Sequence, residues 1–263
     1  MRGKRGSGSR LVSGKRGKSK GVGCYRGSKI LDIMESVDPS NINIPILDLS
    51  SGGLGYDGSD MTAINWIAEA LQPSDSSKLR SLDLSYNLLD ETAGIALAPA
   101  LATNAVLTSF NLSINDIGPN GGKAIAKALK VNSVLIDLNL ASNNIGMNGA
   151  IAIAEALKSS TSRLKILNLS SNKLCVGTSW MMYDSQKAIK AIAGALKDNN
   201  MLTNLNLSSN EIDRKGAMAI ADALKSQRVL THLDLKYNNM GVSERDKKVM
   251  KEMSHRDGLT LLL

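Results

Sequence analysis

The chain has 263 residues, of which 43% are hydrophobic and 3% aromatic, and its formal net charge at pH 7 is +8. The length allows a folded core, and no apolar run is long enough to span a membrane or to form the centre of a secretory signal. The two cysteines, Cys24 and Cys175, are too few for a disulfide framework and lack metal-site spacing. We therefore expect an intracellular protein, cytoplasmic or nuclear, without metal or cofactor.

Residues 1–31 differ in composition from the rest of the chain. They contain ten Lys and Arg and no acid, and Gly and Ser make up most of the remainder. Removing this +10 from the total of +8 leaves −2 for residues 32–263, so the basicity belongs to the tail. Such a segment cannot bury enough apolar surface to offset its chain entropy, and we expect it to be disordered on its own.

Three interpretations of this basic tail stay open. As an electrostatic arm it would bind RNA, DNA or another acidic surface by neutralising phosphates. As an address it would direct the chain to the nucleus or, by organellar import, elsewhere, although its glycines argue against an amphipathic presequence helix. As a solvated segment it would have no defined partner. The cations that would contact an acidic partner are Arg2, Lys4, Arg5, Arg10, Lys15, Arg16, Lys18 and Lys20.

After the tail, an eleven-residue template recurs seven times. It has apolar residues at positions 1, 4, 6 and 11 and asparagine at position 9, except that Gly52 replaces the first asparagine. Successive copies lie 35, 28, 28, 29, 38 and 28 residues apart. They begin at Ile44, Leu79, Leu107, Leu135, Leu164, Leu202 and Leu230, and the asparagines are Asn87, Asn115, Asn143, Asn172, Asn210 and Asn238.

Each copy predicts one short strand followed by one helix. Apolar positions 4 and 6 alternate with polar residues, which is the period of a strand with one buried face. The asparagine can bond backbone groups where the strand turns away. Alanine-rich segments between copies, such as Ala150–Leu157 and Ala217–Leu224, are strong helix formers. Stacked units of this kind predict an α/β solenoid with a curved parallel sheet inside and helices outside.

The template resembles the ribonuclease-inhibitor-type leucine-rich repeats over roughly residues 42–263. The resemblance implies a leucine-rich-repeat domain over 32–263, preceded by the tail over 1–31. Members of this family include ribonuclease inhibitor, the repeat arms of NOD-like receptors and the GTPase activator of Ran, and what they share is binding a protein along the repeats. Because fold alone assigns no activity and no catalytic residues are recognisable, we expect a non-enzymatic scaffold that binds a protein partner.

Two other functions stay open. The resemblance to the Ran activator implies a small-GTPase regulator, although that family has a strongly acidic C-terminal tail where this chain ends in leucines. The other is a structural subunit of a large complex or ribonucleoprotein, in which the tail contacts RNA or a neighbouring subunit. GTP hydrolysis rates measured with a panel of small GTPases separate these functions, because unchanged rates exclude the regulator.

The concave face of the sheet is the expected binding surface. Position 5 is Asp or Asn in every copy, and a sheet of this width can hold a protein surface or a helix. Binding hot spots favour Trp, Tyr and Arg, and two tyrosines at position 8 lie near opposite ends of the sheet. The residues predicted to contact a partner here are Asp83, Tyr86, Asn111, Asn139, Asn168, Asn206, His232, Asp234 and Tyr237.

The fifth repeat carries an insertion within residues 175–186, ahead of a helix predicted over Ala188–Leu196. A loop inserted into a solenoid projects from one edge and is often a binding element. The alternative is a loop that folds back over the helices. The candidate partner contacts in the insertion are Trp180, Met181, Met182 and Tyr183.

At the end of the chain, Leu259–Leu263 predicts an eighth strand. Solenoids need a polar cap, and this strand is apolar. It therefore either pairs with the sheet and leaves its own edge open, or docks elsewhere. An open apolar edge predicts self-association or contact within a larger assembly. Removal of Leu259–Leu263 should then lower the mass of the particle in light scattering.

Overall fold

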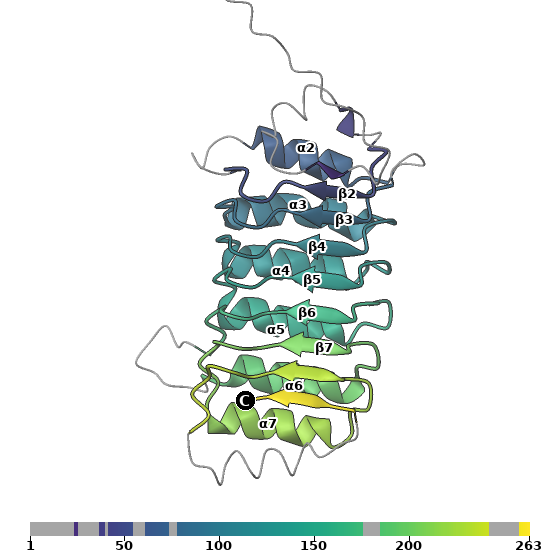
Figure 1. Cartoon of the computed structure of the whole chain (residues 1–263). Coiled ribbons are helices and arrows are strands. Elements are labelled where there is room, and N and C mark those ends of the chain that lie inside the picture. Colours follow the sequence, from purple (N-terminus) through teal and green to yellow (C-terminus); the bar gives the residue numbers. More distant parts are fainter. Residues whose placement is uncertain are drawn as a thin grey trace, which may run out of the picture.

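The structure is a computed structural model, which describes residues 24–25, 37–39, 42–54, 61–73, 78–175, 185–241 and 258–263. Within this part, one parallel sheet runs through the molecule with its strands in chain order from β1 to β9 (Figure 1). Helices α2 to α7 each follow one strand and form a second layer on one side of the sheet. This architecture confirms the predicted α/β leucine-rich-repeat solenoid.

The elements are short and regular. The strands are β1 (Cys24–Tyr25), β2 (Ile46–Asp48), β3 (Ser81–Asp83), β4 (Ser109–Asn111), β5 (Asp137–Asn139), β6 (Ile166–Asn168), β7 (Asn204–Asn206), β8 (His232–Asp234) and β9 (Thr260–Leu262). The helices are α2 (Thr62–Ala70), α3 (Glu91–Thr103), α4 (Gly118–Leu129), α5 (Gly146–Leu157), α6 (Lys187–Asp198) and α7 (Arg214–Leu224). No helix of the described residues is long and apolar enough to cross a membrane.

Strands β2 to β8 coincide with positions 3 to 5 of the seven template copies. Neighbouring strands pair with equivalent template positions opposite each other, as in the pairs Leu82–Phe110 and Phe110–Leu138. Positions 4 and 6 are therefore buried against the helices in every repeat, together with small side chains of the helices. Position 1 is buried in every repeat except the first, where Ile44 is partly buried. One continuous core results, and the two other strand residues point away from it.

A buried column of asparagines at position 9 links the repeats. The Asn172 Oδ1 accepts hydrogen bonds from the backbone N–H of Asn143 (3.0 Å) and Ile145 (3.2 Å) in the preceding repeat. Its Nδ2 donates to the carbonyls of Leu140 (2.8 Å) and Ser170 (3.1 Å). Asn172 is fully buried, and so are Asn87, Asn143 and Asn210. The predicted role of this asparagine is thus confirmed, and most of its bonds cross between repeats.

A second column of polar side chains, which the template does not include, lies where the helices lead back to the strands. The Asn132 Oδ1 accepts from the N–H of Val134 (3.0 Å) and Leu135 (2.8 Å). Its Nδ2 donates to the carbonyls of Leu101 (2.7 Å) and Asn104 (3.2 Å). Asn104, Asn199 and Gln227 make the equivalent bonds in their repeats.

Glycines set the distance between the central helices. A Cβ on Gly121 of α4 would lie 2.7 Å from the Ile117 Cγ2 and 3.5 Å from the Cα of Gly94 in α3. On the neighbouring side, a Cβ on Gly122 would lie 3.0 Å from the Ile145 side chain and 3.6 Å from the Cα of Gly149 in α5. Close approach of α3, α4 and α5 therefore needs hydrogen in place of a side chain at these positions.

The sheet is extended at both ends beyond the seven template copies. β9 pairs in parallel with β8, so the terminal leucines follow the first of the two predicted alternatives. Self-association through this edge stays a prediction. At the other end, β1 pairs with β2 although its residues belong to the segment 1–31. The other residues of that segment, including its eight predicted contact cations, lie outside the described residues.

Position 8 of every template copy has a positive φ, between 55° and 61°. An L-residue in this left-handed region costs roughly 1–2 kcal/mol, and the cost is highest for a β-branched side chain such as Ile114. Ile114 is also half exposed, so it gives up little burial when replaced. We expect Ile114→Asn to raise the free energy of unfolding by about 1 kcal/mol, because Asn tolerates this conformation.

Chemical denaturation measures this effect, and Ile95→Asn is the matched control. Ile95 is exposed to a similar extent but sits in helix α3 with an ordinary negative φ. There the same exchange should be neutral or destabilising, because Asn is a poorer helix former. Equal effects of both substitutions would show that backbone strain at Ile114 contributes nothing.

Candidate protein-binding site

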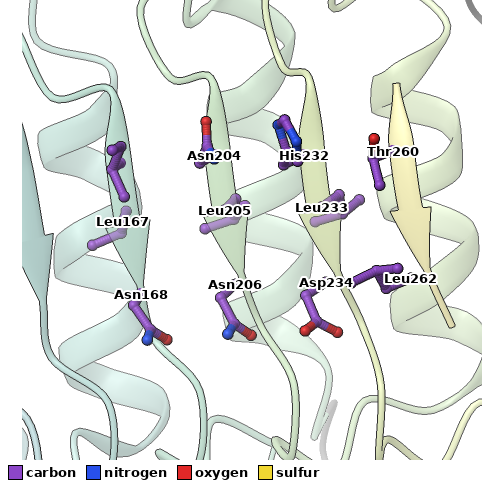
Figure 2. A pocket seen from close by; sticks show the side chains of 11 residues that line it. Leu167, Asn168, Asn204, Leu205, Asn206, His232, Leu233, Asp234, Thr260 and Leu262 are labelled. Atoms are coloured by element: carbon purple, nitrogen blue, oxygen red, sulfur yellow. The ribbon is translucent and has the colours of Figure 1, made fainter. Parts of the chain in front are cut away.

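The face of the sheet opposite the helices, called the open face below, is formed by the first and third residues of the strands. Figure 2 shows Asn204 and His232 at the start of two strands, and Asn206 and Asp234 at their ends. From β2 to β9 the open face holds four carboxylates, those of Asp48, Asp83, Asp137 and Asp234, and neither Lys nor Arg. It is thus an acidic surface.

The Asp and Asn residues at the third strand position have a structural task. The Asp83 Oδ1 accepts from the N–H of Ser85 two residues on, at 2.8 Å, and the Asn206 Oδ1 accepts from Ser208 at 2.9 Å. Equivalent bonds of 2.9 to 3.1 Å fix the predicted contacts Asn111, Asn139, Asn168 and Asp234. These side chains stabilise the end of each strand, so their recurrence does not by itself indicate a partner.

Asp137, by contrast, has no such task. It is the first residue of β5, where the other strands from β2 to β9 carry Ser, Ile, Asn, His or Thr. It is half-buried, and within the described residues its carboxylate has no hydrogen-bond or ion-pair partner. Burial raises the pKa of this carboxyl above its usual range. An unpaired, partly desolvated acid on an open surface is a candidate contact for a cation from a partner.

Two adjacent hollows occupy the open face. The first, of about 320 Å³, extends from β3 to β6 and includes both Asp83 and Asp137. The second, of about 220 Å³, extends from β6 to β9 (Figure 2) and includes His232 and Leu262. Ile166 and Asn168 line both hollows. The open face is therefore divided into a half that holds two carboxylates and a half that holds one, Asp234, beside exposed apolar side chains.

The second hollow contains one imidazole ring, that of His232. The His232 Nδ1 lies 2.9 Å from the hydroxyl of Thr231, and the ring is exposed beside Asn204. Ile166 and Leu262 are each more than a third exposed at the sides of this hollow. Among the described residues, no group of three or more His, Cys, Asp or Glu could hold a metal ion. The arrangement suits a protein contact with polar and apolar parts.

A comparison with protein families agrees with this architecture. A family model described as "Leucine Rich repeat" matches five segments, residues 75–98, 103–126, 131–154, 198–221 and 226–243. The chain therefore contains leucine-rich repeats. No curated protein matches the sequence. The chain is similar to the solved structure of Leiomodin-1 Actin-Binding Site 2 (ABS2), at 23% sequence identity. The match covers 63% of this chain and 87% of that chain, with a TM-score of 0.49.

Other predicted contacts of this leucine-rich-repeat protein lie away from the hollows. Tyr86 and Tyr237 follow their strands by three residues, are exposed, and line neither hollow. The insertion contacts Trp180, Met181, Met182 and Tyr183 lie outside the described residues. Asp137 was not predicted, although it is the only acid in its column of first strand residues.

Cys175 lies just before the insertion and is buried, with its Sγ 3.4 Å from the Gln186 Oε1. Burial, reinforced by the nearby carboxylates of Asp213 and Glu211, raises the pKa of this thiol to about 12. In a Cys24→Ser variant, we expect Cys175 to react with a thiol reagent at pH 8 only as fast as the protein unfolds. At that pH the thiolate fraction is about a thousandfold lower than at an ordinary pKa of 9.

The sign of the pH dependence follows from the raised pKa. The folded thiol retains its proton above pH 9, where the unfolded thiol loses it, so this group's contribution to stability falls as pH rises from about 9 towards 12. Labelling of the native protein should accelerate over the same window. Rapid labelling at pH 8 without denaturant would contradict the assignment.

Proposed function

We propose that this leucine-rich-repeat protein is a non-enzymatic scaffold whose open face binds a segment of another protein. The observation that carries the proposal is Asp137, a half-buried carboxylate without a partner in the described residues. Burial of a charge costs free energy unless an opposite charge compensates it. A Lys or Arg supplied by a partner would provide that compensation and favour the ionised carboxylate.

The second hollow supports an apolar side chain as the neighbour of that proposed cation. It adjoins the first at Ile166 and Asn168, and it offers exposed leucine and isoleucine surface. An apolar side chain next to a basic one would therefore fill both hollows. The acidic character of the open face favours such a segment during encounter and disfavours acidic competitors. The proposed partner thus presents a basic and an apolar side chain to adjacent strands.

The test compares proteins retained from native lysate by the immobilised full chain and by its Asp137→Asn variant. We expect a defined set of proteins to fall about 10- to 100-fold on the variant, since a charged hydrogen bond contributes roughly 1.5–3 kcal/mol. Quantitative mass spectrometry measures the change. Asp198→Asn, an exposed acid at the end of α6, is the control for loss of one charge. Equal retention by all three proteins would refute the role of Asp137.

We also propose that residues 1–31 act as an arm for an acidic partner, which is supported by their ten cations and lack of acids. Deletion of this segment and nuclease treatment of the lysate should remove the same partners, if the arm binds nucleic acid. Proteins that are still retained after both treatments, but that are lost on the Asp137→Asn variant, bind the open face. The same preparation can be added to a panel of small GTPases to measure their rates of GTP hydrolysis. Unchanged rates exclude the alternative function as a small-GTPase regulator.

A further inference from the structure

A second surface lies at the edge of the sheet where each strand begins. The residues that precede β3 to β6 form one row, Arg80, Thr108, Ile136 and Lys165, held by consecutive backbone bonds. The N–H of Thr108 donates to the Arg80 carbonyl (2.8 Å), that of Ile136 to Thr108 (2.9 Å), and that of Lys165 to Ile136 (2.8 Å). The spacing of this row is therefore fixed by the sheet.

A hollow of about 380 Å³, called the basic groove below, is built on this row. Its floor is mainly aliphatic, and Ile136 is 36% exposed within it. Among the described residues, three cations and no acid line it. The lining residues are Arg80, Ala105, Val106, Thr108, Ser133, Val134, Ile136, Arg163, Lys165 and Met201.

The cations of the basic groove flank its apolar floor. Arg80 is fixed at one end, because its Nη1 donates to the Val106 carbonyl at 3.1 Å. Arg163 and Lys165 lie at the other end, are exposed, and make no ion pair within the described residues. The strands of Arg80 and Lys165 are three steps apart, which is roughly 14 Å at the usual strand spacing.

We propose that the basic groove binds an acidic segment of a partner protein, with two carboxylates flanking apolar side chains. An extended segment covers roughly 14 Å with about four residues, so the carboxylates would lie about four positions apart. Its apolar side chains would cover Ile136 and Val134. The groove contains no aromatic side chain on which a base could stack, which favours a peptide over single-stranded nucleic acid. This surface is separate from the acidic open face and differs from it in sign.

The test uses the full chain and a fluorescein-labelled peptide, Gly-Asp-Leu-Ser-Leu-Asp-Gly, with a counterpart that has Asn in place of Asp. Fluorescence anisotropy should show at least tenfold weaker binding of the acidic peptide to Arg163→Gln/Lys165→Gln. Ile136→Ser should also weaken binding, but leave its salt dependence unchanged, because it removes no charge. The thermal midpoint of each variant checks that the fold is retained.

Two exposed lysines of the helix layer offer the control. Lys127→Gln/Lys187→Gln removes the same number of positive charges from α4 and α6, away from the basic groove. It should leave peptide binding within twofold of the unaltered chain. The proposal is overturned if this control loses as much affinity as the groove variant, or if the Asn peptide binds as tightly as the Asp peptide. A competing oligothymidine gives the last test. The proposal is also overturned if this oligonucleotide displaces the peptide and if Arg163→Gln/Lys165→Gln weakens its binding as much as that of the peptide.

Discussion

Asn172→Ala is expected to lower the free energy of unfolding by about 3–5 kcal/mol. The substitution removes four hydrogen bonds at a fully buried site and leaves the N–H groups of Asn143 and Ile145 without their acceptor. Each buried backbone group that loses its partner costs about 1–3 kcal/mol. Chemical denaturation followed by circular dichroism measures the loss.

Asn148→Ala provides the comparison for this prediction. Asn148 lies in the first turn of α5 and is exposed, and no hydrogen bond of its side chain is found within the described residues. Its replacement should change stability by no more than about 0.5 kcal/mol. If Asn172→Ala were as mild as this control, the asparagine column would not stabilise the solenoid.

Gly121→Ala is expected to destabilise the protein by about 1–3 kcal/mol, the usual range for overpacking. The added methyl would lie 2.7 Å from the Ile117 Cγ2 and 3.3 Å from the Glu91 carbonyl oxygen. Ile117 cannot retreat, because it is itself fully buried. The helices α3 and α4 must then separate, which loosens the layer behind the sheet. Thermal and chemical denaturation measure the effect.

Gly194→Ala is the matched substitution, with an effect of opposite sign. Gly194 lies inside α6, and a Cβ there would meet no atom within 4 Å. Alanine should stabilise this helix by about 0.5–1 kcal/mol, because glycine is the poorer helix former. A destabilising Gly194→Ala would mean that steric contact does not distinguish these two glycines.

Most of the fold could be predicted from the template, because the spacing of its apolar positions identifies the residues that are buried. Position 4 alone locates each strand and its register, as the pairing of Leu82 with Phe110 illustrates. The second polar column was missed because its residue type varies. Asn104, Asn132 and Asn199 precede position 1 by three residues, but Gln227 replaces asparagine in the last repeat and Thr161 occupies this offset in another.

The candidate site was predicted less well, for a physical reason. Position 5 is polar in every copy and therefore suggests a binding surface, yet residues such as Asn206 stabilise the end of the strand there. Asp137 differs through its burial and lack of a partner, and both depend on side chains of neighbouring strands. The basic groove likewise joins Arg80 to Lys165, which are far apart in the sequence and meet only through strand stacking.

The bonds of the asparagine column also make neighbouring repeats depend on each other. The N–H of Asn143 is satisfied by Asn172, that of Asn172 by Asn210 at 2.9 Å, and that of Asn210 by Asn238 at 2.8 Å. Opening one repeat therefore exposes an unpaired donor in the repeat before it, and fraying from the C-terminal side propagates towards the N-terminus. Hydrogen exchange at these three amides thus reports the cooperativity between successive repeats, one junction at a time.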